Sequence, residues 1–117
     1  MEIKFTHIAL QCQDITRTRL FYQEYCGMIL VPRKSSPKNE EAFWLVHKSK
    51  PVSTVLVLFS GQCFHKQNKK DYSHLGFSLP SKEEVTQISD KAKHHGILAW
   101  PATQEEDPLG YFCGIRD

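Results

Sequence analysis

Two histidines, His7 and His74, are the residues whose type and placement point most directly to chemistry. Each lies in a short run of alternating side chains, residues 4–12 and 71–79, that leads into a predicted helix. Neutral imidazole is a common metal ligand, and two imidazoles with one carboxylate on one side of an ion leave positions open for a substrate. The alternative is two unrelated, partly buried histidines that hydrogen-bond locally. Their equivalent placement in the two runs favours metal binding.

The elements that must position these histidines follow from an internal repeat. The histidines are 67 residues apart, and a shift of 69 residues superposes three further pairs: Gly27 on Gly96, Pro32 on Pro101 and Phe43 on Phe112. We therefore predict two copies of one unit, residues 1–62 and 71–117, joined by a linker over residues 63–70. Each copy is too short to be more than marginally stable alone, so the two are expected to share one core within a single domain.

Each copy is predicted to begin with a strand and a helix, which further strands follow. In the first copy the strand–helix–strand–strand–strand order covers residues 3–12, 14–26, 28–33, 42–47 and 53–59. In the second copy the same order covers residues 72–79, 81–95, 97–101 and 111–116, and the counterpart of the last strand would lie beyond Asp117. Asp14 and Ser81 are the predicted N-cap residues of the two helices.

Strand alternation separates a mixed face from an apolar face in the first strand of each copy. His7 shares its face with Gln11, and His74 shares its face with Ser78, so these mixed faces are expected to line a cavity. Gln11 and Ser78 are therefore candidates for contacting a substrate. Aromatic side chains are candidates for the apolar part of such a pocket, although at strand spacing they fit a core equally well: Trp44, Trp100 and Tyr111. No residue is assigned a catalytic role.

The composition argues against several classes of partner. The chain carries 15 basic and 13 acidic side chains, and its net charge of +2 implies no nucleic-acid or membrane partner. The N-terminal residues lack the apolar core of a signal peptide, and apolar runs such as Val55 to Phe59 are too short to span a bilayer. The four cysteines show no closely spaced pair. Reduced thiols in a cytoplasmic protein are the simplest interpretation.

Taken together, four motifs make the chain resemble the vicinal oxygen chelate superfamily, which includes glyoxalases, extradiol dioxygenases, fosfomycin-resistance transferases and bleomycin-binding proteins. The resemblance covers all 117 residues and is carried by Thr6–Leu10, Asp14–Met28, Ser73–Phe77 and Gly110–Asp117. The resemblance implies one α+β domain, in which two tandem β-α-β-β-β units form a curved mixed sheet, or cup, with the helices outside. The second unit is expected to lack its last strand.

The resemblance also implies a divalent metal ion, of iron, manganese, zinc or nickel. His7 and His74 match two of the family's metal ligands, and the third, a glutamate, is expected beyond Asp117. Some glyoxalases use a carboxylate on the last strand of the first unit. Residues 53–59 contain no acid, which disfavours chemistry with paired carboxylates. The function that the resemblance implies is a lyase, dioxygenase or thiol transferase that acts on a small substrate with adjacent oxygens, as a homodimer.

Two other functions remain open for this sequence. A binding protein of the bleomycin-resistance type would use the same cup without a metal, although such proteins usually lack the pair of histidines. A structural module whose cup has lost its activity is the third possibility.

Overall fold

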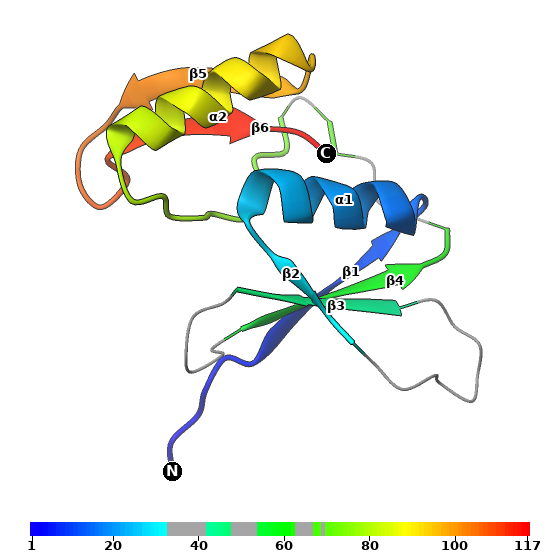
Figure 1. Cartoon of the computed structure of the whole chain (residues 1–117). Helices are drawn as coiled ribbons and strands as arrows, with labels where there is room; N and C mark the ends of the chain where they lie inside the picture. The colour runs from blue at the N-terminus through cyan, green and yellow to red at the C-terminus, as the bar shows by residue number, and fades with distance from the viewer. Residues whose placement is uncertain (33–41, 48–53, 63–66, 69) are drawn as a thin grey trace. The chain divides into compact units, whose positions relative to one another are not determined.

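The computed structural model describes residues 1–32, 42–47, 54–62, 67–68 and 70–117 (Figure 1). Most of the predicted linker, residues 63–66 and 69, lies outside the described residues, as do Arg33 and Ser53 at the ends of two predicted strands. The chain divides into two compact units, Met1–Ser73 and His74–Asp117. Neither described helix combines the length and apolarity that crossing a bilayer requires.

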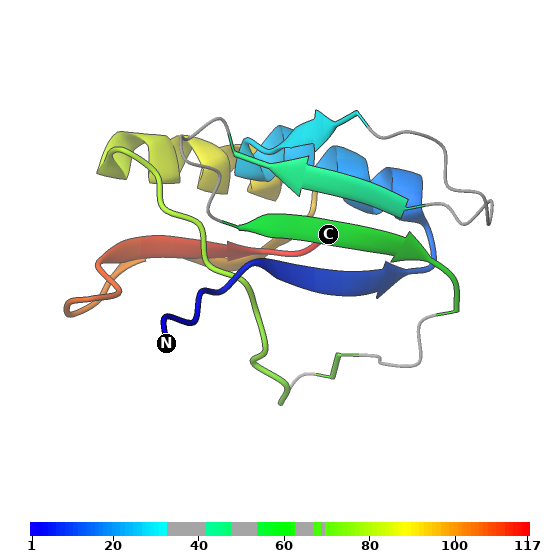
Figure 2. The ribbon, with the colours of Figure 1, turned by 90° about the horizontal axis from the view of Figure 1, so that it is seen from below.

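The first unit contains one helix and a four-stranded sheet. Its elements are β1 (His7–Cys12), α1 (Ile15–Cys26), β2 (Ile29–Val31), β3 (Ala42–Val46) and β4 (Val55–Ser60). The strand order is β1-β4-β3-β2, in which β1 and β4 are parallel and the other neighbours antiparallel. Figure 2 shows β1 beside β4 at one edge of this mixed sheet. The predicted β-α-β-β-β order is confirmed for this unit, with strands somewhat shorter than predicted.

Local sequence signals set both ends of α1. The Asp14 side chain accepts a hydrogen bond of 3.0 Å from the backbone N–H of Arg17, which satisfies one of the donors left unpaired at a helix start. The helix ends at Gly27, whose φ of 63° is the left-handed conformation that glycine adopts at little cost. Between these ends, Ile15, Tyr22 and Tyr25 are buried. Their spacing places them on one apolar stripe of α1, and Figure 1 shows α1 lying over one face of the sheet.

The core of the first unit lies between α1 and one face of its sheet. Residues paired directly across neighbouring strands share a face, so the register places Leu10, Leu58 and Phe43 together on one side. Leu56 and Leu45 form the next pair on that side. Leu45 and Leu58 are fully buried, and α1 packs against β1, β3 and β4.

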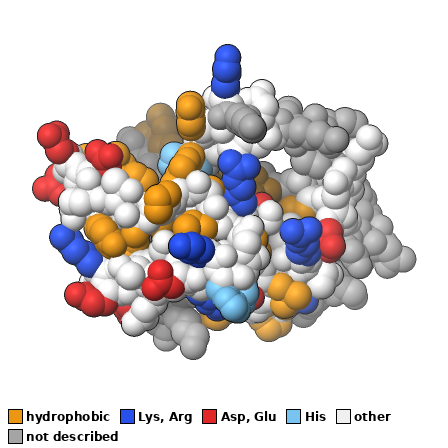
Figure 3. All heavy atoms as spheres, turned by 90° about the horizontal axis from the view of Figure 1, so that it is seen from above, with side chains coloured by type: hydrophobic (Ala, Val, Ile, Leu, Met, Phe, Trp, Pro, Cys, Tyr) orange, Lys and Arg blue, Asp and Glu red, His pale blue; other side chains and the backbone are white. Residues whose placement is uncertain are grey.

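The second unit contains α2 (Lys82–His94) and the antiparallel pair β5 (Leu98–Gln104) and β6 (Tyr111–Ile115). The Ser81 hydroxyl accepts a hydrogen bond of 3.2 Å from the Glu84 backbone N–H, so the predicted N-cap is confirmed. Val85, Ser89 and Ala92 are buried, and α2 packs against both strands. Figure 3 shows acidic, basic and apolar side chains together on the surface seen from above.

The predicted strand over residues 72–79 is not formed. These residues keep the predicted alternation, because Leu75, Phe77 and Leu79 are half-buried while His74, Gly76 and Ser78 are exposed. The matching strand β1 is held by its ladder with β4, and the described residues of the second unit contain no counterpart of β4. An extended segment becomes part of a sheet only when a neighbouring strand pairs with its backbone groups.

Replacing the buried Leu58 tests the core of the first unit. We expect Leu58→Ala to lower the free energy of unfolding by about 2–5 kcal/mol, because it removes a fully buried side chain and leaves a cavity. Leu20→Ala on α1, where the side chain is 52% exposed, is the matched control and should change it by about 0.5 kcal/mol or less. Urea unfolding measures both. Equal effects of the two variants would contradict this placement of the core.

Candidate functional site

The face of the first sheet that lies opposite α1 carries the predicted metal ligand of this unit. We call it the open face. The register across β1, β4, β3 and β2 assigns to it His7, Ala9, Gln11, Val55, Val57, Phe59, Ala42, Trp44, Val46, Ile29 and Val31. Apart from His7 and Gln11, every one of these side chains is apolar. The predicted alternation of β1 is confirmed, since His7, Ala9 and Gln11 are more exposed than Ile8, Leu10 and Cys12.

Large apolar side chains stay accessible on the open face. Trp44 and Phe59 are each 39% exposed, and Ile29 is 37% exposed. Val57, which is paired with Trp44 and precedes Phe59 by two residues on β4, is buried. A mainly apolar surface with a few polar groups is typical of small-molecule sites.

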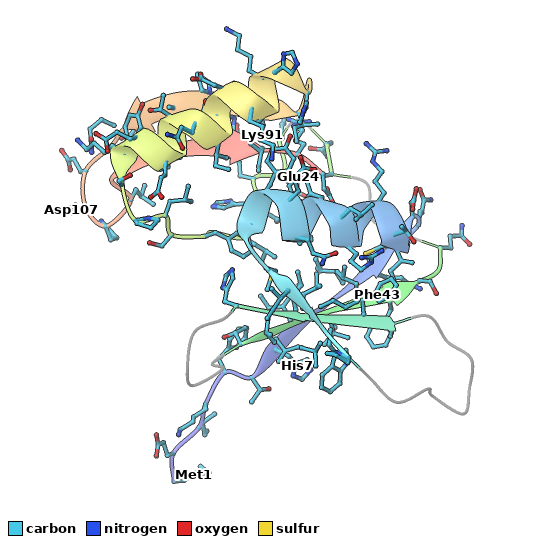
Figure 4. All side chains as sticks on the ribbon, viewed as in Figure 1. Met1, His7, Glu24, Phe43, Lys91 and Asp107 are labelled. Atoms are coloured by element: carbon cyan, nitrogen blue, oxygen red, sulfur yellow. The ribbon has the colours of Figure 1, made fainter. Side chains whose placement is uncertain are left out.

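His7 begins β1 at the edge of this sheet, and Figure 4 labels it on the side away from α1. Its Nδ1 shares a hydrogen bond of 2.9 Å with the Thr6 hydroxyl, and the direction of that bond depends on the tautomer. The Thr6 carbonyl in turn accepts a hydrogen bond of 3.0 Å from the Val55 backbone N–H. When Nδ1 carries the proton and donates to Thr6, the Nε2 lone pair is available to a ligand.

Gln11 stands at the other end of β1, beside the end of β4. A depression of about 400 Å³ is lined there by Ala9, Leu10, Gln11, Phe59 and Ser60. Gly61 follows β4 with a φ of 145°, and a Cβ at this position would collide with the Gln11 side-chain amide. Gly61 therefore gives the Gln11 amide the room it occupies at the rim of the depression.

In the second unit, Trp100 and His74 lie next to each other on the side away from α2. Trp100 is paired with Gly114 in the register of β5 and β6, and it is 41% exposed. The His74 and Trp100 rings meet edge to face, with 6.3 Å between their centroids and 85° between their planes. Ser78 is exposed on the extended segment that also carries His74, four residues along the chain.

Tyr111 lies on the opposite face of this sheet, against α2. Its hydroxyl shares a hydrogen bond of 3.0 Å with the Thr86 hydroxyl, and the Lys82 ammonium lies 5.9 Å from the centroid of its ring. Cys113, two residues further along β6, faces α2 as well, and its Sγ is 4.0 Å from the Val85 carbonyl oxygen. Burial raises the pKa of the Cys113 thiol, which lowers the fraction of reactive thiolate.

Three further histidines lie at helix ends. His47 Nε2 is 2.9 Å from the Cys26 carbonyl oxygen, so a protonated Nε2 donates to one of the last carbonyl groups of α1. His94 and His95 are exposed at the end of α2, with ring centroids 5.7 Å apart. Within either unit, the described residues bring together no three histidine, cysteine or acidic side chains that could hold a metal ion.

Sequence patterns did not identify Phe59 and Gly114, two residues that shape the surfaces described above. Phe59 belongs to the unbroken apolar run of β4, in which alternation cannot tell one face from the other, and only its pairing with Gln11 places it on the open face. Gly114 lies under the Trp100 indole. A glycine inside a strand is the one sequence signal for such a close approach.

Nearly the whole chain matches a known protein family. Residues 4–117 match the family model described as Glyoxalase/Bleomycin resistance protein/Dioxygenase superfamily. An uncharacterized protein of Pseudomonas aeruginosa, PA2024, is 32% identical over 117 residues, which are 100% of this chain and 83% of that protein.

Two solved structures share the fold. A possible glyoxalase from Bacillus cereus is 22% identical with a TM-score of 0.67, covering 87% of this chain and 82% of that one. A mutant of the fosfomycin resistance protein FosX from Listeria monocytogenes, complexed with Mn(II) and 1S,2S-dihydroxypropylphosphonic acid, is 17% identical with a TM-score of 0.74. The match covers 100% of this chain and 85% of that one. The predicted α+β fold is thereby confirmed.

Gly61 offers a test of the local geometry beside Gln11. We expect Gly61→Ala to lower the free energy of unfolding by about 1–3 kcal/mol, because an alanine at this positive φ is strained and its Cβ displaces the Gln11 amide. Gly76→Ala is the matched control, since its Cβ would meet nothing within 4 Å. Chemical denaturation of the two variants gives the comparison. A Gly61→Ala protein as stable as Gly76→Ala would be evidence against this backbone conformation.

Proposed function

We propose that this chain, which belongs to the Glyoxalase/Bleomycin resistance protein/Dioxygenase superfamily, is a divalent-metal-dependent enzyme that acts on a small substrate with two adjacent oxygens. The observation that carries the proposal is the repeated histidine. His7 begins β1 on the open face of the first unit, and His74 occupies the equivalent position of the second. Both imidazoles are exposed, whereas a histidine serving only the core would be covered.

The chemistry of these donors fits a divalent ion. His7 has a hydroxyl partner for Nδ1, and a hydrogen bond at one ring nitrogen orients the ring and makes the other nitrogen a better ligand. His74 is the proposed second ligand, and a glutamate carboxylate would be the third. Iron, manganese, zinc or nickel suits such a set, and the FosX structure crystallised with Mn(II) makes manganese the first ion to test. A bound ion of this kind would act as a Lewis acid on a substrate oxygen.

The open face supplies the proposed contacts for the rest of the substrate. Trp44 and Phe59 offer exposed aromatic surface, and the Gln11 amide offers a hydrogen-bonding group beside the depression next to Phe59. In the second unit, Trp100 and Ser78 are exposed and remain proposed contacts. Tyr111 is left out of the proposal because its hydroxyl is bonded to Thr86 under α2.

A metal-free binding protein of the bleomycin-resistance type is the second candidate. The observation that favours it is the exposed apolar surface of the open face, where Trp44, Phe59 and Ile29 are each more than one-third exposed. Such a surface would bind an apolar small molecule without any ion. The two candidates differ in whether the histidines are needed.

We also propose that the protein works in the cytoplasm as a homodimer. The described cysteines, Cys12, Cys26 and Cys113, form no disulfide with one another, which suits a reducing compartment. The dimer rests on the family resemblance alone. Sedimentation equilibrium of the purified protein would test it, and a single species with the mass of one chain would exclude it.

Metal content separates the two candidate functions. We expect the full-length protein, purified without chelator, to retain close to one equivalent of divalent metal per chain by elemental analysis. His7→Ala or His74→Ala should remove it, because each variant deletes one of the proposed ligands. His94→Ala, at the exposed end of α2, is the control and should keep the metal.

The comparison is made on variants whose circular dichroism matches that of the unchanged protein. Metal that survives in both His7→Ala and His74→Ala would rule out the proposed ligands. A protein that takes up no divalent ion at all would favour the metal-free binding protein.

A further inference from the structure

We propose that Trp100 and Gly114 act together to orient the imidazole of His74, which makes Trp100 a positioning residue for the metal site. The inference rests on the proposed function, since His74 is a proposed metal ligand. It adds two residues of β5 and β6 whose role is to fix the direction of a ligand rather than to bind the ion. Indole has no lone pair to offer a metal, so Trp100 can affect a bound ion only through His74.

His74 differs from His7 in what surrounds its backbone. His7 is part of β1, which pairs with β4 along its whole length, and the preceding residue, Thr6, holds its ring through a hydrogen bond of 2.9 Å. His74 lies in residues 72–79, which form no strand. A ligand carried by a segment without a strand ladder needs another contact to fix its ring. The nearby Trp100 ring provides one.

Gly114 sets the position of the Trp100 indole. The two residues face each other across β5 and β6. A Cβ built on Gly114 would collide with the indole, at the atoms Cε3, Cδ2 and Cζ3. The ring therefore lies directly on the backbone of β6, in space that any other residue would fill with its side chain. The absence of a side chain at position 114 leaves the space that the indole occupies.

The indole in turn limits the orientation of His74. The two rings meet edge to face, with planes 85° apart and centroids separated by 6.3 Å. Aromatic rings prefer this arrangement, because the positive edge of one ring lies against the negative face of the other. Trp100 is 41% exposed, so a role in filling the core does not explain its conformation.

The first test uses the metal-free protein. In aromatic proton–carbon spectra at one fixed pH, the ring current of Trp100 should displace the His74 ring protons from the positions seen for the exposed His94. His74→Ala assigns the signals. Trp100→Ala should remove the displacement, and Gly114→Ala should reduce it, because the new Cβ pushes the indole off β6.

Gly76→Ala is the matched control for this test. It makes the same substitution two residues from His74, at a position where a Cβ meets nothing within 4 Å. It should leave the His74 signals displaced. His74 protons that are undisplaced in the unchanged protein, or that respond equally to Gly76→Ala and Gly114→Ala, would overturn the inference.

The second test measures Mn(II) affinity by titration of the chelator-treated protein. We expect Trp100→Ala and Gly114→Ala to weaken binding about tenfold, the low end for residues that orient a metal ligand. Trp100→Phe should restore most of the affinity, since phenylalanine keeps an aromatic face, and Gly76→Ala should match the unchanged protein.

The outcomes keep the two proposals apart. If His74→Ala abolishes Mn(II) binding while Trp100→Ala and Gly114→Ala bind normally, the metal site stands and the orienting role of Trp100 is wrong. If the unchanged protein binds no Mn(II), the proposed function fails with this ion, and a metal-site role for Trp100 fails with it. The aromatic proton–carbon spectra then show only whether the His74 and Trp100 rings are in contact.

Discussion

The parallel pairing of β1 with β4 is the interaction on which the first unit depends. It joins residues 7–12 to residues 55–60 and so adds β1 to the sheet that β2, β3 and β4 form, with α1 in the connection. Parallel pairing needs a long crossover, and here α1, β2 and β3 supply it. The pairing also sets which side chains of β1 point away from α1. His7 lies on the open face because its Cα partner is Val55 and not a residue one position further along.

The second unit lacks this pairing among its described residues. Its helix α2 is capped at the N-terminus by Ser81, and it packs on β5 and β6 much as α1 packs on its own sheet. The segment equivalent to β1 keeps its alternating burial and yet forms no strand. His7 thus lies in a strand ladder and has a hydroxyl partner, whereas His74 contacts the Trp100 ring edge to face. The same position in the repeat is stabilised by different interactions.

Much of the fold could be predicted because its signals are local. Asp14 and Ser81 satisfy N–H groups three residues away, and Gly27 ends α1 by its own backbone conformation. The alternation in β1 separated the two faces of the sheet correctly because apolar and mixed positions differ there. In β4, alternation could not separate the two faces. Both faces of that strand are apolar, so Phe59 and Leu58 look equivalent until the register is known.

The sequence by itself determined the repeat, the helix boundaries, the two histidines at equivalent positions and the family, since each depends on residues close together or on a regular spacing. Only the tertiary structure decided that Trp44 is exposed on the open face while Tyr111 bonds to α2, and that Trp100 rests on Gly114 beside His74. It also decided that residues 72–79 form no strand. These outcomes depend on which backbone lies beside which. Strand register and pairing join residues far apart in the chain, and no local pattern specifies them.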